Sequence, residues 1–445
     1  MGRREQMSET TVQMFLQRCV QQGYKNPAEH LATLLSQGEV TIRHQRHQGV
    51  TRVMIEKKES KFLDMDPETM LSSTGLCLNQ TYAKVMHNNG VWPEDLEYLK
   101  TSLNHSKTFY QRWHRLQGRY YPMGSLSHIN HPGWRSAFEF AEEYRCTSEQ
   151  WKEAGLSTDS LDAVMKMPRT KKWWGQISQA IAYKDVCNRG ATKYVAYADG
   201  RTDGLAHLSV WAGDTQGIVD TMLDGISPSL SLAQYADVDT TTAKTMVTPM
   251  IYGAGAKALS RVLMGDPEAE PTSEAKDMGV AAHEWFGNRY PQVVKLQQKF
   301  VQLVQAFNAK GAELNSIVDG EVITPRTLKT DPDAVKTAVR LYQDRKPINV
   351  CWFPPVMTQT PAAYLPLLVH GWEGCVVKHI STSMGKEPYL PVHDGHGCKV
   401  TSLASMQTKW SSAMQALLKD PTPYQQIGGP APQFDRWEEV RHLKV

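Results

Sequence analysis

The strongest constraint on the fold of this chain comes from two apolar segments that both end in Asp-Gly. The first, KYVAYADG at residues 193–200, is rich in β-forming residues and stops at Asp199. The second, YLPVHDG at residues 389–395, delivers Asp394 in the same way. Asp and Gly are common turn residues, so each motif also fits an ordinary loop after a strand. The alternative is that the two motifs present a pair of acids at strand ends to hold a metal ion.

Length and composition set the class of protein. A chain of 445 residues with 41% hydrophobic and 21% charged residues predicts a globular protein of two or three domains. It has no apolar run of about 18 residues, so we expect no transmembrane helix. The opening MGRREQMSETTVQMF lacks the apolar core of a signal peptide, and we expect an intracellular protein. The seven cysteines form no C-x-x-C pair, which indicates neither a cysteine zinc site nor a disulfide framework.

Local positive charge is more informative than the net charge of +3. The segment VTIRHQRHQGVTRVMIEKK at 40–58 predicts two strands around Gly49, which present either a solvated face or a surface for phosphate backbones. The segment KMPRTKKWWGQ at 166–176 places four cations beside two tryptophans. It fits a helix end anchored by aromatic rings, or a polyphosphate site.

Periodicity predicts a helix-rich α/β fold. Strand signals predict the hairpin at 40–58, the strand at 193–200, a hairpin at 316–325 that turns at Asp319-Gly320, and a strand leading into Asp394. Helical patterns cover 11–36, 92–117, most of 134–190, 202–223, 238–262, 276–309 and 401–419.

The helix expected between the two acids adds a third element. Lys244 and Tyr252 lie eight residues apart in DTTTAKTMVTPMIYGAG, which separates them by about 80° around an α-helix. The ammonium group can meet a triphosphate while the ring meets a sugar or base. The same pattern also fits an amphipathic helix with a solvated lysine and a core tyrosine. Two carboxylates with substrate phosphates are a usual environment for Mg²⁺.

In these motifs and their order the chain resembles the single-subunit RNA polymerases of bacteriophages and mitochondria. LQGRYYP is similar to a Gly-Arg-x-Tyr element, and KMPRTKKWW places a lysine seven residues before a tryptophan. YADGRTDGLAHLS and VHDGHG resemble the two metal motifs, KTMVTPMIYG the finger helix, and LVHGWEG a histidine element. The matching residues are Gly118, Arg119, Tyr121, Lys166, Asp199, Gly200, Gly204, His207, Lys244, Tyr252, Gly253, His370, His393 and Asp394.

The resemblance implies a right-hand polymerase fold with a palm and inserted fingers. The palm would combine residues 109–215 with 371–445, and the fingers would be residues 216–370. Residues 1–108 would form an N-terminal or thumb-like region, with apolar surface on 11–36 available for docking of a subunit.

It also implies the metal and triphosphate ligands. Asp199 and Asp394 would coordinate two Mg²⁺ ions, with the carbonyl of Gly200 as a further ligand. Lys244 and Lys166 would contact the triphosphate and neutralise charge as pyrophosphate leaves.

The remaining site residues would contact sugar and nucleic acid. Tyr252, followed by Gly253, would close the nucleotide site and help to select ribose, with His370 near the 2′-hydroxyl. Arg119 and Tyr121 would follow the nucleic-acid backbone, and His393 would lie near the RNA 3′ end.

The chain departs from the family pattern on the finger helix. Thr240 and Thr245 stand where the family usually has arginines, so Lys257 and Arg261 become candidates for binding the triphosphate. Pro249 removes a helical hydrogen bond and should kink the helix. Gly395 follows Asp394 where the family commonly has serine.

The implied function is Mg²⁺-dependent, DNA-directed RNA synthesis from ribonucleoside triphosphates. The chain resembles the larger, catalytic chain of a heterodimeric phage polymerase, which acts in the cytoplasm of a bacterial host. We expect a DNA template, an RNA product, a second subunit supplying the N-terminal half and a single-stranded-DNA-binding factor. The alternatives are a DNA polymerase or primase of the same palm class and a non-catalytic nucleic-acid-binding subunit.

Overall fold

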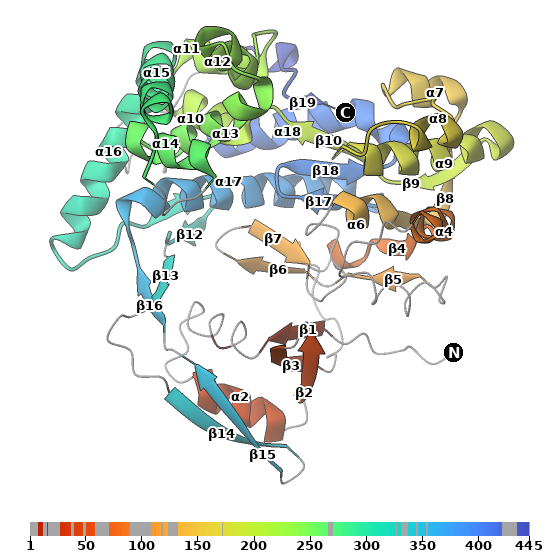
Figure 1. The fold of residues 1–445 in the computed structure, drawn as a ribbon, viewed down its shortest axis with the longest axis horizontal. Helices are drawn as coiled ribbons and strands as arrows, with labels where there is room; N and C mark the ends of the chain where they lie inside the picture. Colours follow the sequence, from red (N-terminus) through yellow and green to blue (C-terminus); the bar gives the residue numbers. More distant parts are fainter. Residues whose placement is uncertain are drawn as a thin grey trace.

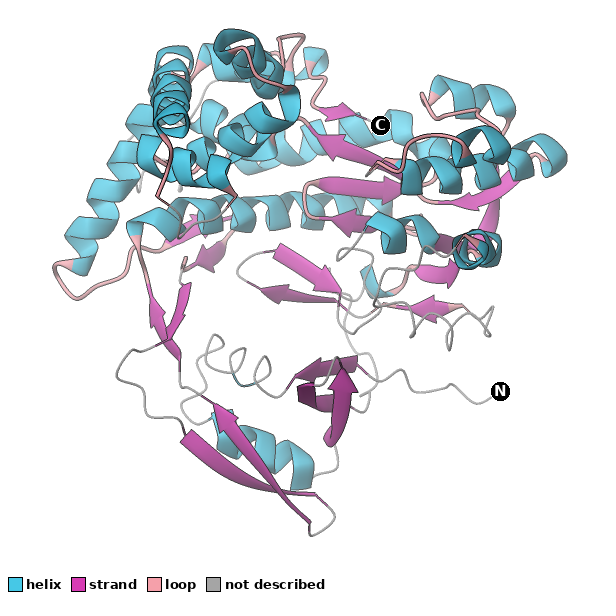
Figure 2. Cartoon of the chain, viewed as in Figure 1, coloured by secondary structure: helices cyan, strands magenta, loops and turns pink. Residues whose placement is uncertain are grey.

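The computed structural model describes residues 8–11, 16, 27–36, 40–47, 50–57, 71–89, 108–111, 113–116, 119–122, 132–170, 172–265, 270–325, 327–330, 337–343, 346–352, 355–420 and 434–444. Within them helices predominate and the strand pairs are antiparallel (Figure 2). The helix-rich α/β part of the predicted fold class is therefore confirmed, and the right-hand polymerase fold stays a prediction.

A four-stranded sheet joins segments that are far apart in the chain (Figure 1). Its order is β17 (Leu390–Val392), β18 (Gly395–Cys398), β10 (Ala196–Gly200) and β19 (Leu443–Lys444). β17 and β18 form a hairpin, and β10 pairs with β18 on one side and β19 on the other. Residues 196–200 of the strand predicted at 193–200 thus form β10, and two segments from the C-terminal part of the chain, β18 and β19, pair with it on either side.

A second four-stranded sheet precedes it in the chain. Its order is β5 (Phe109–Tyr110), β4 (Gly75–Leu78), β8 (Phe138–Arg145) and β9 (Ala191–Tyr194). Only Val195 separates β9 from β10, so the chain passes directly from one sheet to the other. The helices on this side are α4 (Gln80–Asn88), α6 (Pro132–Ala137), α7 (Ser148–Glu153), α8 (Leu161–Met165) and α9 (Trp173–Arg189).

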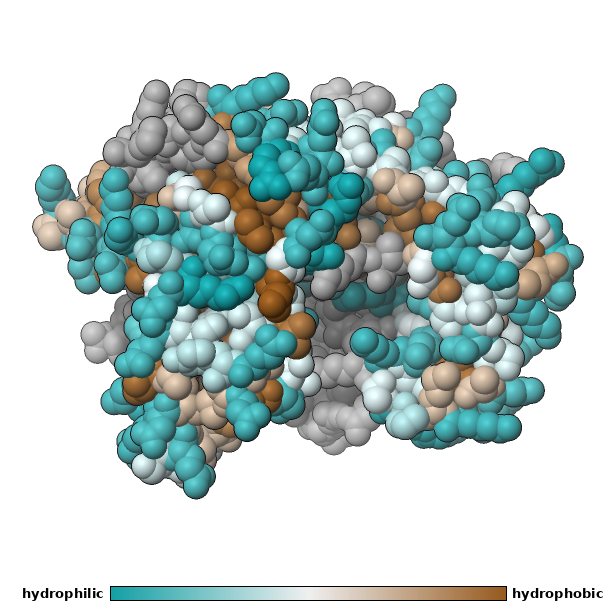
Figure 3. All heavy atoms as spheres, turned by 90° about the horizontal axis from the view of Figure 1, so that it is seen from above, coloured by the Kyte–Doolittle hydropathy of each residue, from teal (hydrophilic) through white to brown (hydrophobic). Residues whose placement is uncertain are grey.

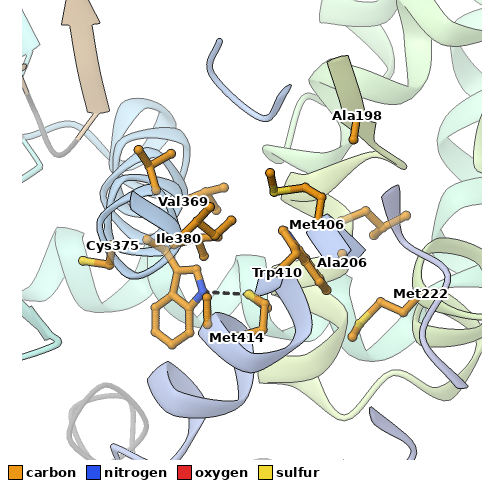
Figure 4. Close-up of a cluster of buried hydrophobic side chains, with 14 of the residues drawn as sticks. Ala198, Ala206, Met222, Val369, Cys375, Ile380, Met406, Trp410 and Met414 are labelled. Carbon is orange, nitrogen blue, oxygen red and sulfur yellow. Dashed lines mark hydrogen bonds between the residues drawn. The ribbon is translucent and has the colours of Figure 1, made fainter. Parts of the chain in front are cut away.

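Three helices form the core behind β10. α10 (Asp203–Ala212) is buried from Asp203 to Trp211, as expected of a helix surrounded by protein on every side. α17 (Pro361–Met384) packs against α10, α16 (Pro291–Asn308) and α18 (Leu403–Leu418). Figure 4 shows buried side chains of this core, among them Val369, Met406 and Met414. The indole of Trp372 donates to the sulfur of Met414 at 3.5 Å. This packing fixes the helices that carry the site residues.

A group of helices, called the helical lobe below, lies in sequence between β10 and β17 of the first four-stranded sheet. Each predicted long helix is broken there: 202–223 into α10 and α11, 238–262 into α13 and α14, and 276–309 into α15 and α16. The lobe contains α11 (Thr215–Met222), α12 (Pro228–Ala236), α13 (Thr240–Ile251), α14 (Ala256–Met264), α15 (Ser273–Arg289) and α16 (Pro291–Asn308). The breaks follow local chemistry, because Gly213 takes a left-handed conformation and Pro291 starts a new helix.

The remaining described elements are short sheets, the helix α2 and the two 3-10 helices η1 (Val400–Ser402) and η2 (Trp437–Glu439). The strands and α2 are β1 (Ser8–Thr11), α2 (Pro27–Ser36), β2 (Val40–His47), β3 (Val50–Lys57), β6 (Trp113–Leu116), β7 (Arg119–Pro122), β11 (Ser316–Val318), β12 (Glu321–Ile323), β13 (Thr327–Thr330), β14 (Thr337–Gln343), β15 (Lys346–Trp352) and β16 (Pro355–Thr358). The predicted hairpins at 40–58 and 316–325 are present.

Several predicted helices are wrong in part. Residues 109–116 form β5 and β6 rather than the end of a helix, and 138–145 form β8, because Phe138 and Phe140 pack across sheet partners. Thr11 pairs with β3, and only 27–36 of the helix expected at 11–36 is described as a continuous helix. The boundary expected after residue 370 falls inside α17.

The described helices include none that is both long and apolar enough to cross a membrane. Seen from above, the described surface is mostly hydrophilic, with apolar patches on the helical side (Figure 3). Exposed apolar side chains on α12, α14 and α15 include Leu230, Tyr235, Val262 and Val280.

Crowding at Gly397 yields a stability prediction. A Cβ there would lie 2.6 Å from the carbonyl oxygen of Leu390 and 2.8 Å from the ring of Tyr197. We expect Gly397→Ala to lower the free energy of unfolding by about 1–3 kcal/mol, as overpacking does. Gly287→Ala on α15, where nothing lies within 4 Å of the new Cβ, is the control and should be neutral or slightly stabilising. Thermal unfolding compares the two, and equal midpoints would contradict the prediction.

Candidate functional site

The two acids singled out in the sequence lie side by side. Asp199 is paired with Gly395 in the β10–β18 register, and the amide of Gly200 donates to the carbonyl of Asp394 at 3.3 Å. A Cβ on Gly395 would lie 3.3 Å from Oδ1 of Asp199, so the carboxylate covers that glycine. Strand pairing therefore brings together two carboxylates that are far apart in the chain.

The surroundings of Asp199 and Asp394 disfavour ionisation of both carboxyl groups. Burial raises the pKa of Asp394 to about 7, and the charges of Asp203 and Asp199 add to this effect. Burial also raises the pKa of Asp199, as does Asp203, while Arg135 and Lys244 oppose the increase. A divalent cation between the carboxylates would relieve the repulsion, so the residues present fit Mg²⁺. The carbonyl of Gly200 accepts from the amide of Thr202 at 3.1 Å and keeps a second lone pair for an ion.

The turn that carries Asp394 is strained. His393 and Asp394 form the two-residue loop between β17 and β18, and His393 has φ 53°. Glycine is the usual residue at a first turn position with positive φ. Strain of this kind persists where surrounding structure enforces it, often at functional sites. The ring of His393 meets that of Tyr121 edge to face at 5.8 Å, and burial, with Arg119 and Arg135 nearby, lowers its pKa to about 4.

A layer of buried charged residues lies next to the pair, and sequence reasoning missed most of it. Arg119 on β7 donates from Nε to Glu373 at 2.6 Å, and burial raises the pKa of Glu373 to about 8. Asp203, at the start of α10, is bonded to His442. Gly200 must be glycine here, because a Cβ would lie 2.6 Å from Cγ of Asp203.

Sequence spacing could have identified some of these buried charged residues. Asp203 opens a second Asp-Gly only four residues after Asp199, and Glu373 lies one helical turn after His370. Arg135 and His442 stand in segments without a motif. Arg135 lies on α6, where its guanidinium is 5.7 Å from the ring centroid of Tyr197.

The end of α13 lies against this cluster. Tyr252 caps the helix, and a Cβ on Gly204 would lie 2.7 Å from its hydroxyl. Its ring meets that of His370 edge to face at 6.4 Å, and burial raises the pKa of the phenol. Burial lowers the pKa of His370 to about 3, so this imidazole is neutral. Gly253 follows with φ 87°, a conformation that suits glycine.

The two candidate lysines differ in position. Lys244 is exposed on α13, and its charge lowers the pKa of Asp199. Lys166 is exposed at the end of α8, among the helices α7 to α9, and no contact between described residues connects it to the acids. Beside it the indole of Trp173 donates to Val164 at 3.0 Å, so the segment 166–176 has an aromatic anchor. Gly118 lies outside the described residues.

Comparison with known proteins adds no family assignment. The chain matches no protein-family model and no curated protein sequence.

The raised pKa of Asp394 predicts how stability depends on pH. An unfolded aspartate ionises near pH 3.9, whereas Asp394 in the fold keeps its proton to about pH 7. Between these values the folded state binds more protons, so this group makes the free energy of unfolding fall as pH rises. Asp394→Asn removes that loss and, without metal ions, should be more stable than wild type by roughly 2–4 kcal/mol at pH 8.

Thermal unfolding in a chelator from pH 4.5 to 8 measures this effect. The advantage of Asp394→Asn should grow with pH and shrink when Mg²⁺ is added. Asp277→Asn, on the exposed face of α15, should follow the wild-type curve at every pH. An advantage that stays constant across this range would contradict the burial of an acid with a raised pKa.

Proposed function

We propose that this protein is a DNA-directed RNA polymerase of the single-subunit type, with a palm that carries two catalytic aspartates. The observation that carries the proposal is the pairing of β10 with β18, which sets Asp199 beside Asp394. The position of Tyr252 against Gly204 and beside His370 supports it. Four of the six motifs that resemble the polymerase family, those of Asp199, Tyr252, His370 and Asp394, thus meet in one cluster.

In this mechanism Asp199 and Asp394 would hold two Mg²⁺ ions, and the carbonyl of Gly200 would be available as a further ligand. The ions, when bound, would activate the RNA 3′-hydroxyl and neutralise the leaving pyrophosphate. Lys244, an exposed lysine on α13 whose charge lowers the pKa of Asp199, would contact the triphosphate. Arg261 on α14 stays a candidate for the same anion on sequence grounds alone.

Sugar selection would depend on Tyr252 and His370. The phenol hydroxyl is confined by Gly204, and the neutral imidazole of His370 can accept or donate one hydrogen bond. The ion pair of Arg119 with Glu373 keeps that arginine close to both groups. The rings of His393 and Tyr121, which contact each other edge to face, lie on the side of the β17–β18 hairpin.

Two alternatives are tested together. A DNA polymerase or primase of the same palm class would share the acid pair, and a non-catalytic nucleic-acid-binding subunit would need no metal. Extension of a labelled RNA primer on a DNA template, with ribonucleotides and deoxyribonucleotides in parallel, separates the three. The second subunit, the single-stranded-DNA-binding factor and the role of Lys166 stay predictions.

Removing either acid should abolish nucleotide addition. Asp199→Asn and Asp394→Asn keep the shape of the side chain but remove a metal-ligand charge worth several kcal/mol in the transition state. We expect extension to fall by at least a thousandfold, while binding of the template, measured by fluorescence anisotropy, changes little. Asp277→Asn is the matched control on the surface. Substantial extension by either acid variant at ordinary Mg²⁺ would rule out the two-metal assignment.

Tyr252→Phe should relax the choice of sugar. The change removes one hydroxyl and little volume, so addition of ribonucleotides should continue. A site that hydrogen-bonds a substrate hydroxyl rejects the analogue without it, and loss of the partner weakens this rejection. Competition between a ribonucleotide and its deoxy analogue measures the ratio, which should fall about tenfold or more. Tyr290→Phe, whose buried phenol donates to Asp220 at 2.8 Å, controls for the loss of a buried tyrosine hydroxyl elsewhere. The same ratio in wild type and Tyr252→Phe would exclude Tyr252 as the selector.

A further inference from the structure

Three potential metal ligands meet in the protein interior close to, but apart from, the two strand-end acids. Asp203 and His207 lie one turn apart on α10, and Glu373 faces them from α17. One ligand atom of each lies within 4.8 Å of the others, and all three residues are buried. A modest closure of these distances would give the spacing of ligands around a single ion.

His207 is the observation that indicates a missing partner. The residue is 0% exposed, and neither Nδ1 nor Nε2 has a hydrogen-bond partner among the described residues. A buried polar group without a partner costs about 1–3 kcal/mol. The indole of Trp372, 6.3 Å from the imidazole between ring centroids, cannot satisfy a ring nitrogen in this geometry. A metal ion bound to the lone pair of the unprotonated ring nitrogen would supply a partner for that nitrogen.

The two carboxylates also have room for a further partner. His442 contacts Oδ1 of Asp203, and Arg119 contacts Oε2 of Glu373. The second oxygen of each acid enters none of the hydrogen bonds between described residues. His442 itself is fixed from behind, since its Nδ1 lies 2.9 Å from the carbonyl of Thr221 and its ring stacks on Trp410 at 4.1 Å. Such outer contacts orient metal ligands in known sites.

We propose that Asp203, His207 and Glu373 bind one transition-metal ion, Zn²⁺ by the chemistry of its ligands, at a site separate from Asp199 and Asp394. One imidazole with two carboxylates suits zinc, which accepts nitrogen and oxygen donors, whereas Mg²⁺ prefers oxygen ligands and water. The ion ties α10 to α17 and holds Asp203 against Gly200. Three protein ligands leave the fourth position of a tetrahedral zinc ion to a water molecule, and the site does not depend on the proposed polymerase activity.

Metal analysis of the full chain tests the proposal. The protein is produced in medium containing zinc, dialysed against Mg²⁺ buffer and measured by mass spectrometry for metal content. We expect about one zinc per chain in wild type. His207→Gln, Asp203→Asn and Glu373→Gln should each lower zinc affinity at least tenfold, measured by competition with a chromophoric chelator. His396→Gln is the matched control, because His396 is also buried and has one ring nitrogen without a partner.

A second set of variants locates the ion. The double variant Asp199→Asn, Asp394→Asn should keep its zinc, and Co²⁺ in place of zinc should give a visible absorption band that His207→Gln loses. Circular dichroism shows whether each variant is folded, and the near-isosteric Asp203→Asn serves if His207→Gln is not. A folded wild type that retains no zinc would overturn the proposal. So would zinc that is lost from the double variant but kept by the His207 and Asp203 variants.

Discussion

Antiparallel pairing between β10 and β18 is the interaction on which the site depends. The pairing aligns Ala196 to Asp199 with Cys398 to Gly395, and a one-residue slip would turn Asp199 to the opposite face of the sheet. Glycines make the alignment possible, because Gly395 and Gly397 leave space for Asp199 and Tyr197. The register is set by this packing rather than by a local turn, since the two strands come from distant parts of the chain.

Buried charge is the second constraint. Asp199, Asp203, Glu373 and Asp394 influence one another, and burial raises the pKa of all of them except Asp203, which His442 keeps ionised. Arg119 compensates part of this charge through Glu373. Removing one partner of a buried ion pair costs more than the pair contributes, so these groups are interdependent. A substitution of any one of these residues therefore changes the charge state of the others.

The sequence predicted the elements whose signals are local. The hairpins at 40–58 and 316–325, the strand ending at Asp199 and the turn at Asp394 follow from β-forming residues and glycines. The strands β5, β6 and β8 were missed because their aromatic residues also fit a helical face, and sheet partners decide between the two. Arg135 and His442 reach the site only through tertiary packing, which no spacing within their own segments encodes.

The place of β10 between β18 and β19 has a consequence during synthesis on the ribosome. β18 leaves the ribosome about 195 residues after β10, and β19 about 240 residues after it. At 5–20 residues per second, both edges of β10 lack their final partners for roughly 10–50 s. An unpaired apolar strand is a template for wrong pairing with other chains. The nascent chain therefore needs protection of this segment, by early packing of α10 over it or by a chaperone, until the last strand arrives.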